Sequence, residues 1–266
     1  METLAEKALR IRILIFDIDG TTYQNDIKDN PASTKKALAQ LRQAGYRLAI
    51  CTSRSRDEMV HLPADFLASM DAVASVAGGQ IDADGRRDNH WLDADQVAAG
   101  MAFLDSHEMV YRWVDGQGHG YLNRHQPRYD GFFSYLYDMV PPLKDYDGRP
   151  LVHILYYTDD GQLSSQARAC FDRQNVVDFA PCHEVTACGV DKAASVRRLA
   201  ALFGLDAGQA AVFGDGGNDV GMLRAAGVGI AMGNACPACR QAADYVTDAI
   251  QDDGLYNACV RMGWIR

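Results

Sequence analysis

A short apolar run that ends in two carboxylates constrains the fold of this chain more than any other feature. Ile13 to Phe16 are apolar and rich in β-branched residues, and the run is too short for a buried helix, which predicts a strand buried on both faces. Asp17 and Asp19 follow, and Gly20 lets the chain turn away without steric cost. Open α/β sheets bind ligands at this edge, where two carboxylates repel each other unless a cation or a shared proton offsets their charge. The pair points to chemistry, although acidic pairs also cap and solvate loop starts.

The segments that follow continue a βα pattern. Ser33 is predicted to cap a helix that ends at Gly45, and Tyr46 to Cys51 form a second predicted strand. A βαβ crossover makes these two strands parallel. Thr52-Ser53-Arg54 then opens a predicted helix over about residues 55–69. Helix starts favour anions, so these hydroxyl groups predict an anion site, with an ordinary Ser/Thr helix cap as the alternative.

Residues 80–182 differ in composition and in their pattern of predicted elements from the rest of the chain. Aromatic residues cluster there, and turn signals separate strand-like runs at 109–114 and 151–157 from helical patterns at 95–106 and 162–173. This mixture predicts an α+β insertion. The βα pattern returns after it, so we expect residues 1–79 and 183–266 to form one core and residues 80–182 to form a separate domain.

Further polar groups of the core lie at the starts and ends of predicted elements. Lys192 falls in the first turn of a predicted helix, where the helix dipole disfavours a cation. It needs an anion nearby, unless it is a solvated lysine whose stem covers apolar surface. A second apolar strand over residues 210–214 ends at Asp215, and Asn218 and Asp219 follow where the next helix begins.

Four carboxylates would converge if these two strands are neighbours: Asp17, Asp19, Asp215 and Asp219. At ~4 Å and an effective dielectric of about 20, each adjacent pair of carboxylates costs on the order of 4 kcal/mol, so the group needs a cation. Hard oxygen ligands favour Mg²⁺, which keeps water ligands and binds together with substrate phosphate. The sequence therefore predicts a magnesium site.

Composition argues against several classes of function. The chain of 266 residues has a net charge of -9 and no basic run, whereas binding to a nucleic-acid backbone relies on clustered Lys and Arg. Met1 to Arg10 lacks the apolar core of a signal peptide, and no segment is apolar enough to span a bilayer. The seven cysteines are scattered and odd in number, which predicts free thiols and a cytoplasmic protein. Cys236 and Cys239 have zinc-ligand spacing, but without a second pair nearby we expect two free thiols.

The chemistry-bearing segments, in their order along the chain, resemble the four motifs of the haloacid dehalogenase-like phosphohydrolases: Asp17-Ile-Asp19-Gly-Thr21-Thr, Thr52-Ser53-Arg54, Lys192 and Gly214-Asp215-Gly-Gly-Asn218-Asp219. The stretch Gly229-Ile-Ala-Met-Gly-Asn234 and the long insertion resemble the Cof-type (type IIB) subfamily. The resemblance implies an α/β fold, with a Rossmann-like doubly wound parallel sheet core and an inserted α+β cap domain. Ser53 stands where many relatives have glycine, and Gly78-Gly79 stands where the subfamily often has Asn-Gly. The substrate preferences of relatives are therefore less transferable to this chain.

The resemblance also implies a mechanism. Asp17 would attack phosphorus to form an aspartyl-phosphate, and Asp19 would protonate the leaving alkoxide and then activate water. Mg²⁺ would be held by Asp17, the main-chain carbonyl of Asp19 and Asp215. The phosphoryl oxygens would be bound by Thr52, Ser53, Lys192 and Asn218, while Asp219 would orient Lys192 and metal-bound water.

We therefore expect a magnesium-dependent phosphatase that hydrolyses a small phosphorylated metabolite, such as a sugar phosphate, with the insertion closing over the site as a cap. Two alternatives share the core, a phosphomutase and a non-catalytic phospho-aspartate signalling module. A signalling module needs neither an acid/base two residues after its phosphoacceptor nor a cap. His119, Arg124 and His125 of the insertion are candidates to contact substrate, with exposed loop residues as the alternative interpretation. The sequence specifies neither the ester nor the oligomeric state.

Overall fold

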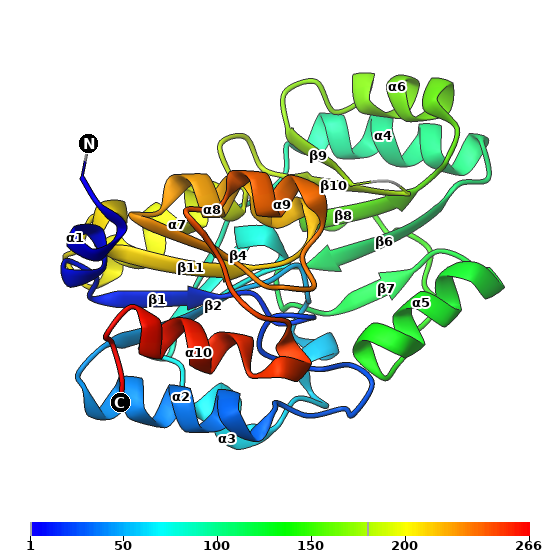
Figure 1. Cartoon of the computed structure of the whole chain (residues 1–266). Helices are drawn as coiled ribbons and strands as arrows, with labels where there is room; N and C mark the ends of the chain where they lie inside the picture. The colour runs from blue at the N-terminus through cyan, green and yellow to red at the C-terminus, as the bar shows by residue number, and fades with distance from the viewer. Residues whose placement is uncertain (1, 180) are drawn as a thin grey trace.

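The central strand lies where the sequence predicts it. The computed structural model describes residues 2–179 and 181–266; Met1 and Ala180, which the predicted domain ranges include, lie outside the described residues. The larger unit, the core, has an eight-stranded sheet with the order β13-β12-β11-β1-β2-β3-β4-β5 (Figure 1). Its strands are β1 (Ile13–Phe16), β2 (Arg47–Cys51), β3 (Ala72–Ser75), β4 (Gln80–Ala83), β5 (Arg86–Asn89), β11 (Ala210–Gly214), β12 (Val228–Ala231) and β13 (Tyr245–Val246). All four residues of β1 are buried, and β1 is parallel to its neighbours β2 and β11.

Helices cover both faces of the core sheet because successive side chains of a buried strand point to opposite faces. Leu14 and Phe16 pack against one helical layer, and Ile13 and Ile15 against the other. The first layer consists of α2 (Ala32–Gln43), α3 (Ala64–Ala68) and α10 (Gly254–Arg261), and the second of α7 (Lys192–Leu202), α8 (Val220–Ala225) and α9 (Pro237–Ala242) (Figure 1). The short helix α1 (Leu4–Leu9) packs through Ala8 on the apolar cluster of the first layer. Short 3₁₀ turns join these elements: η1 (Asp57–Met59), η2 (Val76–Gly78), η3 (Ala207–Gln209), η4 (Gly217–Asp219) and η5 (Ile250–Asp252).

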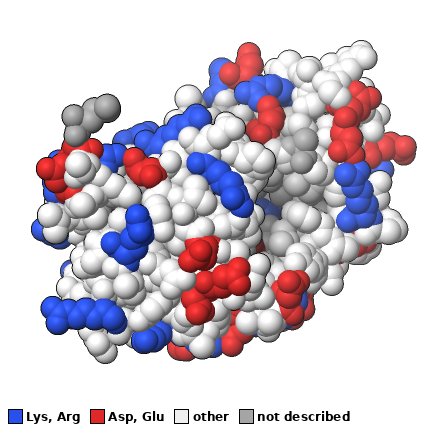
Figure 2. Space-filling model, in the orientation of Figure 1, with Lys and Arg blue, Asp and Glu red and all other residues white. Residues whose placement is uncertain are grey.

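A second unit, the cap, has a five-stranded antiparallel sheet with the order β7-β6-β8-β10-β9. Its strands are β6 (Val110–Asp115), β7 (Gly120–Leu122), β8 (Leu151–Tyr157), β9 (Asn175–Phe179) and β10 (Cys182–Thr186). On one face lie α4 (Ala94–Ser106) and α6 (Gly161–Ala169), and on the other α5 (Pro127–Tyr137). Figure 2 shows the surface hollowed where the core and the cap meet. The predicted α/β fold, a doubly wound parallel sheet with an inserted α+β unit, is confirmed.

The limits of the cap sheet differ from the predicted limits of the insertion, Gln80 and Cys182. β4 and β5 form a hairpin, and β4 pairs antiparallel with β3, so residues 80–89 extend the core sheet. The hairpin turns at Asp84-Gly85, where φ is 50° and 71°, the dipeptide and conformation typical of a two-residue hairpin loop. At the other end, β10 pairs with β8 and β9, so the chain leaves the cap sheet only after Thr186.

Two predicted helix boundaries in the first half of the chain are wrong. α2 begins at Ala32 directly after Pro31, so Ser33 lies inside the helix and does not cap it. The predicted helix over residues 55–69 is instead the turn η1 followed by α3. Pro63 separates the two because it has no N–H to donate within a continuous helix.

All seven cysteines are free thiols, as predicted, and the Cys239 thiol donates to the carbonyl of Gly216. Among the helices of the described residues, none combines the length and the apolar character that a membrane span requires.

Candidate functional site

Three core strands bring predicted site residues to one edge of the sheet. Asp17 follows β1, Thr52 follows β2 and Asp215 directly follows β11. Both β2 and β11 pair with β1 in parallel, so their carboxyl ends lie side by side. The N–H of Asp17 also donates to the carbonyl of Phe213 at 3.0 Å, which fixes the chain where β1 ends. This is the edge at which α/β sheets bind ligands.

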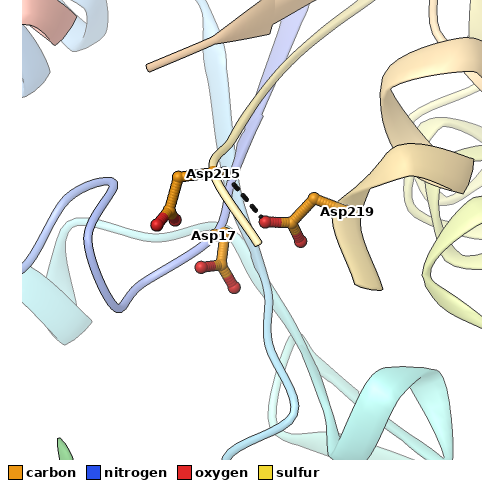
Figure 3. A group of neighbouring side chains, drawn as sticks. All are labelled: Asp17, Asp215 and Asp219. Atoms are coloured by element: carbon orange, nitrogen blue, oxygen red, sulfur yellow. Dashed lines mark hydrogen bonds between the residues drawn. The ribbon is translucent and has the colours of Figure 1, made fainter. Parts of the chain in front are cut away.

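Asp17, Asp215 and Asp219 form a compact acidic group (Figure 3). Each carboxylate offers an oxygen, and these oxygens lie within 4.8 Å of one another. Asp219 Oδ2 accepts from the N–H groups of Asp215 and Gly216, both at 2.9 Å. Lys192, at the start of α7, donates from Nζ to Asp17 Oδ1 at 2.8 Å and to Asp219 Oδ1 at 2.7 Å. Lys192 therefore has the anionic neighbours that a lysine at a helix start needs, and it is buried rather than solvated.

The charges of this group do not balance. Three carboxylates, Asp17 included, and one ammonium leave the buried group with two negative charges in excess. Burial, reinforced by the charge of Asp219, raises the pKa of Asp17 well above its ordinary value and the pKa of Asp215 to about 7. Burial by itself lowers the pKa of Lys192, but the carboxylates of Asp17 and Asp219 outweigh it and raise that pKa. A divalent cation that prefers carboxylate oxygens fits both the excess charge and the ligand type.

The side chain of Asp19 does not belong to the acidic group but pairs with Arg54. Arg54 donates from Nε to Asp19 Oδ2 at 2.9 Å and from Nη2 to Oδ1 at 2.6 Å, and Asn25 Nδ2 donates to Oδ1 at 2.8 Å. The buried Arg54 guanidinium also lies over the rings of Tyr23 and Tyr137. Arg54 had no predicted role beyond its motif, although its position directly after the Thr-Ser pair is a signal for one.

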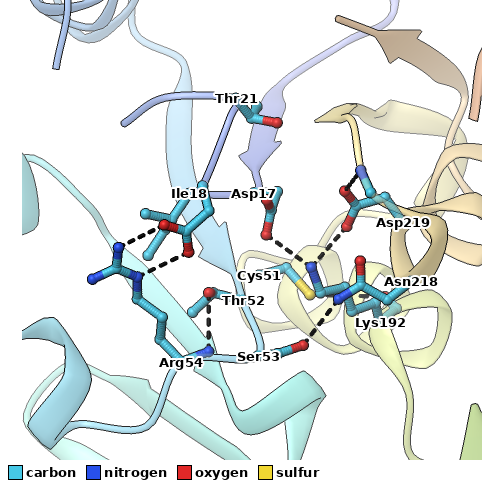
Figure 4. Close-up of polar contacts among 12 residues, drawn as sticks. Asp17, Ile18, Thr21, Cys51, Thr52, Ser53, Arg54, Lys192, Asn218 and Asp219 are labelled. Carbon is cyan, nitrogen blue, oxygen red and sulfur yellow. Dashed lines mark hydrogen bonds and ion pairs between the residues drawn. The ribbon is translucent and has the colours of Figure 1, made fainter. Parts of the chain in front are cut away.

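The predicted phosphate-binding residues lie between these two groups. Thr52 Oγ1 accepts from the N–H of Arg54 at 3.2 Å, and Ser53 Oγ accepts from Asn218 Nδ2 at 3.1 Å (Figure 4). One cavity of about 220 Å³ is lined by seven of the eight predicted site residues: Asp17, Asp19, Thr52, Ser53, Lys192, Asp215 and Asn218. The eighth, Asp219, is completely buried and contacts the site through its hydrogen bonds.

Three residues that were not predicted as site residues hold Asp215 in place. Thr21 Oγ1 donates to Asp215 Oδ1 at 2.9 Å. Asn234 Nδ2 donates to Asp215 Oδ2 at 3.4 Å and to the carbonyl of Gly20 at 2.9 Å. Gly20 has a φ of 76°, and a Cβ atom there would collide with the Asp215 carboxylate. All three lie in motifs visible in the sequence, but their contact with Asp215 depends on the pairing of β1 with β11.

The cap closes the other side of the cavity, which is lined by Phe132, Leu136, Tyr137, Leu155, Phe179 and Cys182. The last turn of α5 contacts the core through its carbonyl groups. Lys28 donates to the carbonyl of Tyr135, while Arg54 and Asn25 donate to that of Leu136 at 2.6 and 2.9 Å. The carbonyl end of a helix carries partial negative charge and has unpaired acceptors, so the two cations stabilise this contact.

The three polar cap residues expected near substrate do not line this cavity. His119 pairs with Asp57, and His125 pairs with Asp130. Arg124 and His125 line a separate groove on the surface of the cap. The alternative interpretation, that these are exposed loop residues, agrees with the structure for both histidines, whose side chains are about half exposed.

A second buried polar cluster joins the phosphate-binding segment to the cap. Glu58 of η1 forms an ion pair with Arg112 of β6, and both side chains are inaccessible to solvent. Arg112 also donates to the carbonyl of Ser53 at 3.2 Å and contacts His153 Nδ1 at 3.2 Å. His153 Nε2 pairs with Glu184 of β10 at 3.0 Å. Three adjacent cap strands, β6, β8 and β10, thus each contribute a buried polar side chain. These side chains contact one another and also the core.

Known proteins resemble this chain in sequence and in fold. The profile of a family described as haloacid dehalogenase-like hydrolase matches residues 14–259. A Bacillus subtilis (strain 168) protein named Putative phosphatase YkrA is 26% identical over 272 residues, which covers 96% of this chain and 99% of that protein. The solved structure of the HAD subclass IIB sugar phosphatase BT4131 has a TM-score of 0.86 at 24% identity, covering 96% of this chain and 100% of that one. The structure of BT1666 from Bacteroides thetaiotaomicron has a TM-score of 0.82 at 24% identity, covering 96% of both chains.

Proposed function

The chain belongs to the haloacid dehalogenase-like hydrolases, and we propose that it is a magnesium-dependent phosphatase that hydrolyses a small phosphorylated metabolite through an aspartyl-phosphate. The observation that carries this proposal is the separation of two carboxylates at the end of one strand. Asp17 contacts Lys192 within the acidic group, while Asp19 is held by Arg54 in the same cavity. Carboxylates in different environments suit different roles in one reaction.

Asp17 is the proposed nucleophile. Its carboxylate attacks phosphorus, the bond from phosphorus to the ester oxygen breaks, and the aspartyl-phosphate forms. Lys192 donates to this carboxylate at 2.8 Å and offsets negative charge as the substrate phosphate approaches. The phosphoryl oxygens are bound by groups that line the cavity around Asp17, namely Thr52, Ser53, Lys192 and Asn218.

Asp19 is the proposed acid and base. In the first step it gives a proton to the leaving alkoxide, and in the second its carboxylate takes a proton from the water that attacks the aspartyl-phosphate. Arg54 and Asn25 orient this carboxyl group, and both also donate to the carbonyl of Leu136 in the cap. The same two side chains therefore connect the position of Asp19 to the closed position of the cap.

Asp17, Asp215 and the main-chain carbonyl of Asp19 are the proposed ligands of Mg²⁺. When bound, the ion would neutralise the excess negative charge and polarise a phosphoryl oxygen. Asp219 is not a proposed ligand, because its oxygens already accept from Lys192 and from the N–H groups of Asp215 and Gly216. Its proposed role is to orient Lys192 and metal-bound water. In this proposal the cap excludes bulk water while the aspartyl-phosphate exists.

Two variants test the assignment with an activated aryl phosphate, whose leaving group needs little protonation. Asp17→Asn should abolish release of the aryl alcohol. Asp19→Asn should release a burst near one equivalent of enzyme and then turn over about 10²–10⁴-fold more slowly than wild type, with phosphate on the peptide that contains Asp17. Equal steady activity in the two variants, or a burst without that label, would contradict the proposal. Measuring free phosphate against isomerised product separates a phosphatase from a phosphomutase.

A further inference from the structure

The part of the cavity formed by the cap is apolar. Four of its six lining residues have hydrocarbon side chains, and the other two are a tyrosine and a cysteine: Phe132, Leu136, Tyr137, Leu155, Phe179 and Cys182. Within residues 2–179 and 181–266, no charged cap side chain belongs to this lining. With the phosphoryl group held on the core side at Asp17, the leaving group of a bound ester extends toward these residues.

The buried charged and histidine side chains of the same cap strands already have partners. Arg112 is paired with Glu58, and His153 with Glu184, and all four are buried outside the lining of the cavity. A polyol placed against this surface would give up hydrogen bonds to water and find only the Tyr137 hydroxyl and the Cys182 thiol to replace them. An apolar leaving group of the same size would instead gain from being removed from water.

The volume of the closed site limits the size of the leaving group. The cavity measures about 220 Å³, whereas an apolar cavity of about 150 Å³ accommodates benzene. The remainder is room for a phosphoryl group and little more. The cap is docked on the core through the carbonyls of Tyr135 and Leu136, and Phe179 of the cap and Gly217 of the core line the same cavity, so this volume belongs to the closed arrangement.

We propose that the substrate is a phosphate monoester of a small, uncharged and mainly apolar alcohol, with a single ring or a short aliphatic chain. The proposal rests on the proposed phosphatase function and specifies its leaving group. Sugar phosphates present several hydroxyl groups to a wall that offers them only the Tyr137 hydroxyl and the Cys182 thiol among the described cap residues, and nucleotides exceed the volume. Phe132, Leu155 and Phe179 select the substrate by burying its apolar surface.

Two esters of nearly the same shape test this substrate class. Cyclohexylmethyl phosphate and glucose 6-phosphate both have a six-membered ring and a primary alkoxide leaving group, so they differ mainly in hydroxyl groups. With Mg²⁺ present, wild-type kcat/KM should be at least about 10-fold higher for cyclohexylmethyl phosphate, since an apolar pocket discriminates against an added hydroxyl by up to about 100-fold. A ratio below 10 overturns the proposal.

A variant of the lining and a matched control locate the selectivity. Phe132 is 37% exposed and lines the cavity, so Phe132→Ser should fold and should bring the ratio of the two kcat/KM values toward one. Phe103→Ser alters a phenylalanine of α4 that packs on the opposite face of the cap sheet, and it should keep the wild-type ratio. An unchanged ratio in Phe132→Ser, or the same drop in both variants, would refute the role of the apolar wall.

Acetyl phosphate separates failure of the substrate class from failure of the proposed function. If it phosphorylates Asp17 while glucose 6-phosphate is the better ester, the substrate class is refuted and the phosphatase proposal stands. If no phosphate compound labels the peptide that contains Asp17, both proposals are refuted.

Discussion

Removing one partner of the ion pair between Glu58 and Arg112 should destabilise the protein strongly. The two side chains are almost fully inaccessible to solvent, and the pair joins a 3₁₀ turn of the core to a strand of the cap. Arg112→Met leaves the Glu58 carboxylate buried with only the N–H of Ser55 as a recorded donor among the described residues. An uncompensated buried charge costs about 3–5 kcal/mol, a large part of a total stability of about 5–15 kcal/mol.

The double variant Glu58→Met/Arg112→Met distinguishes the charge from the packing. It removes both charges and keeps apolar volume, so its loss should be about 1–3 kcal/mol, mostly from the N–H of Ser55 and the carbonyl of Ser53, which lose their partners. Each single variant, Arg112→Met or Glu58→Met, should lose more than the double variant. At about 2–4 °C per kcal/mol, the single variants should melt roughly 6–20 °C below wild type.

A double-mutant cycle measured by urea unfolding provides the decisive number. We expect a coupling free energy of several kcal/mol between Glu58 and Arg112, because both single variants leave a charge that the double variant does not. If the losses of the single variants add up to the loss of the double variant within about 0.5 kcal/mol, the buried pair is not electrostatically coupled and the reasoning fails.

Three further predictions concern the acidic group and the cap. Chelation should abolish turnover and added Mg²⁺ should restore it; full turnover after exhaustive chelation would contradict the metal site. Gly20→Ala should weaken Mg²⁺ binding in an activity titration. The positive φ of residue 20 costs an L-residue roughly 1–2 kcal/mol, and the new Cβ would displace the Asp215 carboxylate. An unchanged Mg²⁺ affinity would count against this contact. Burial lowers the pKa of His153, so the unfolded chain is protonated first and stability is lost as pH falls through about 6.5. His153→Gln should flatten this loss in urea unfolding curves between about pH 7.5 and 5.5, and a slope as steep as that of wild type would refute it.

The core could be predicted from the sequence because its signals are local. β1 coincides with the predicted apolar run, and parallel strands that end in polar residues define the binding edge without knowledge of distant contacts. The pairing of residues 80–89 with the core sheet could not be predicted for the converse reason. Asp84-Gly85 signals a hairpin, but only the pairing of β4 with β3 assigns that hairpin to the core sheet.

The candidate site divides in the same way. Asp17, Lys192 and Asp215 stand out in the sequence because charges at strand ends and helix starts need partners. The contacts of Arg54 cannot be predicted from the sequence in this way, because one of them is with the carbonyl of Leu136 in α5, which lies 82 residues further along the chain. The apolar wall of the cavity was also hidden, because Phe132 in the sequence is indistinguishable from the other aromatic residues of the insertion.

The different environments of Asp17 and Asp19 follow from where β1 ends. Residues two apart on a strand point to the same face, so a longer β1 would direct both carboxylates to one place. The strand stops at Phe16, and the carbonyl of Ile18 then accepts from the N–H groups of residues 21, 22 and 23, which closes a tight turn around Asp19. Asp17 remains at the strand end beside Lys192, and Asp19 is carried by the turn to Arg54. The change of backbone direction after β1 thus gives the two aspartates separate partners. The proposed roles of nucleophile and acid/base require this separation.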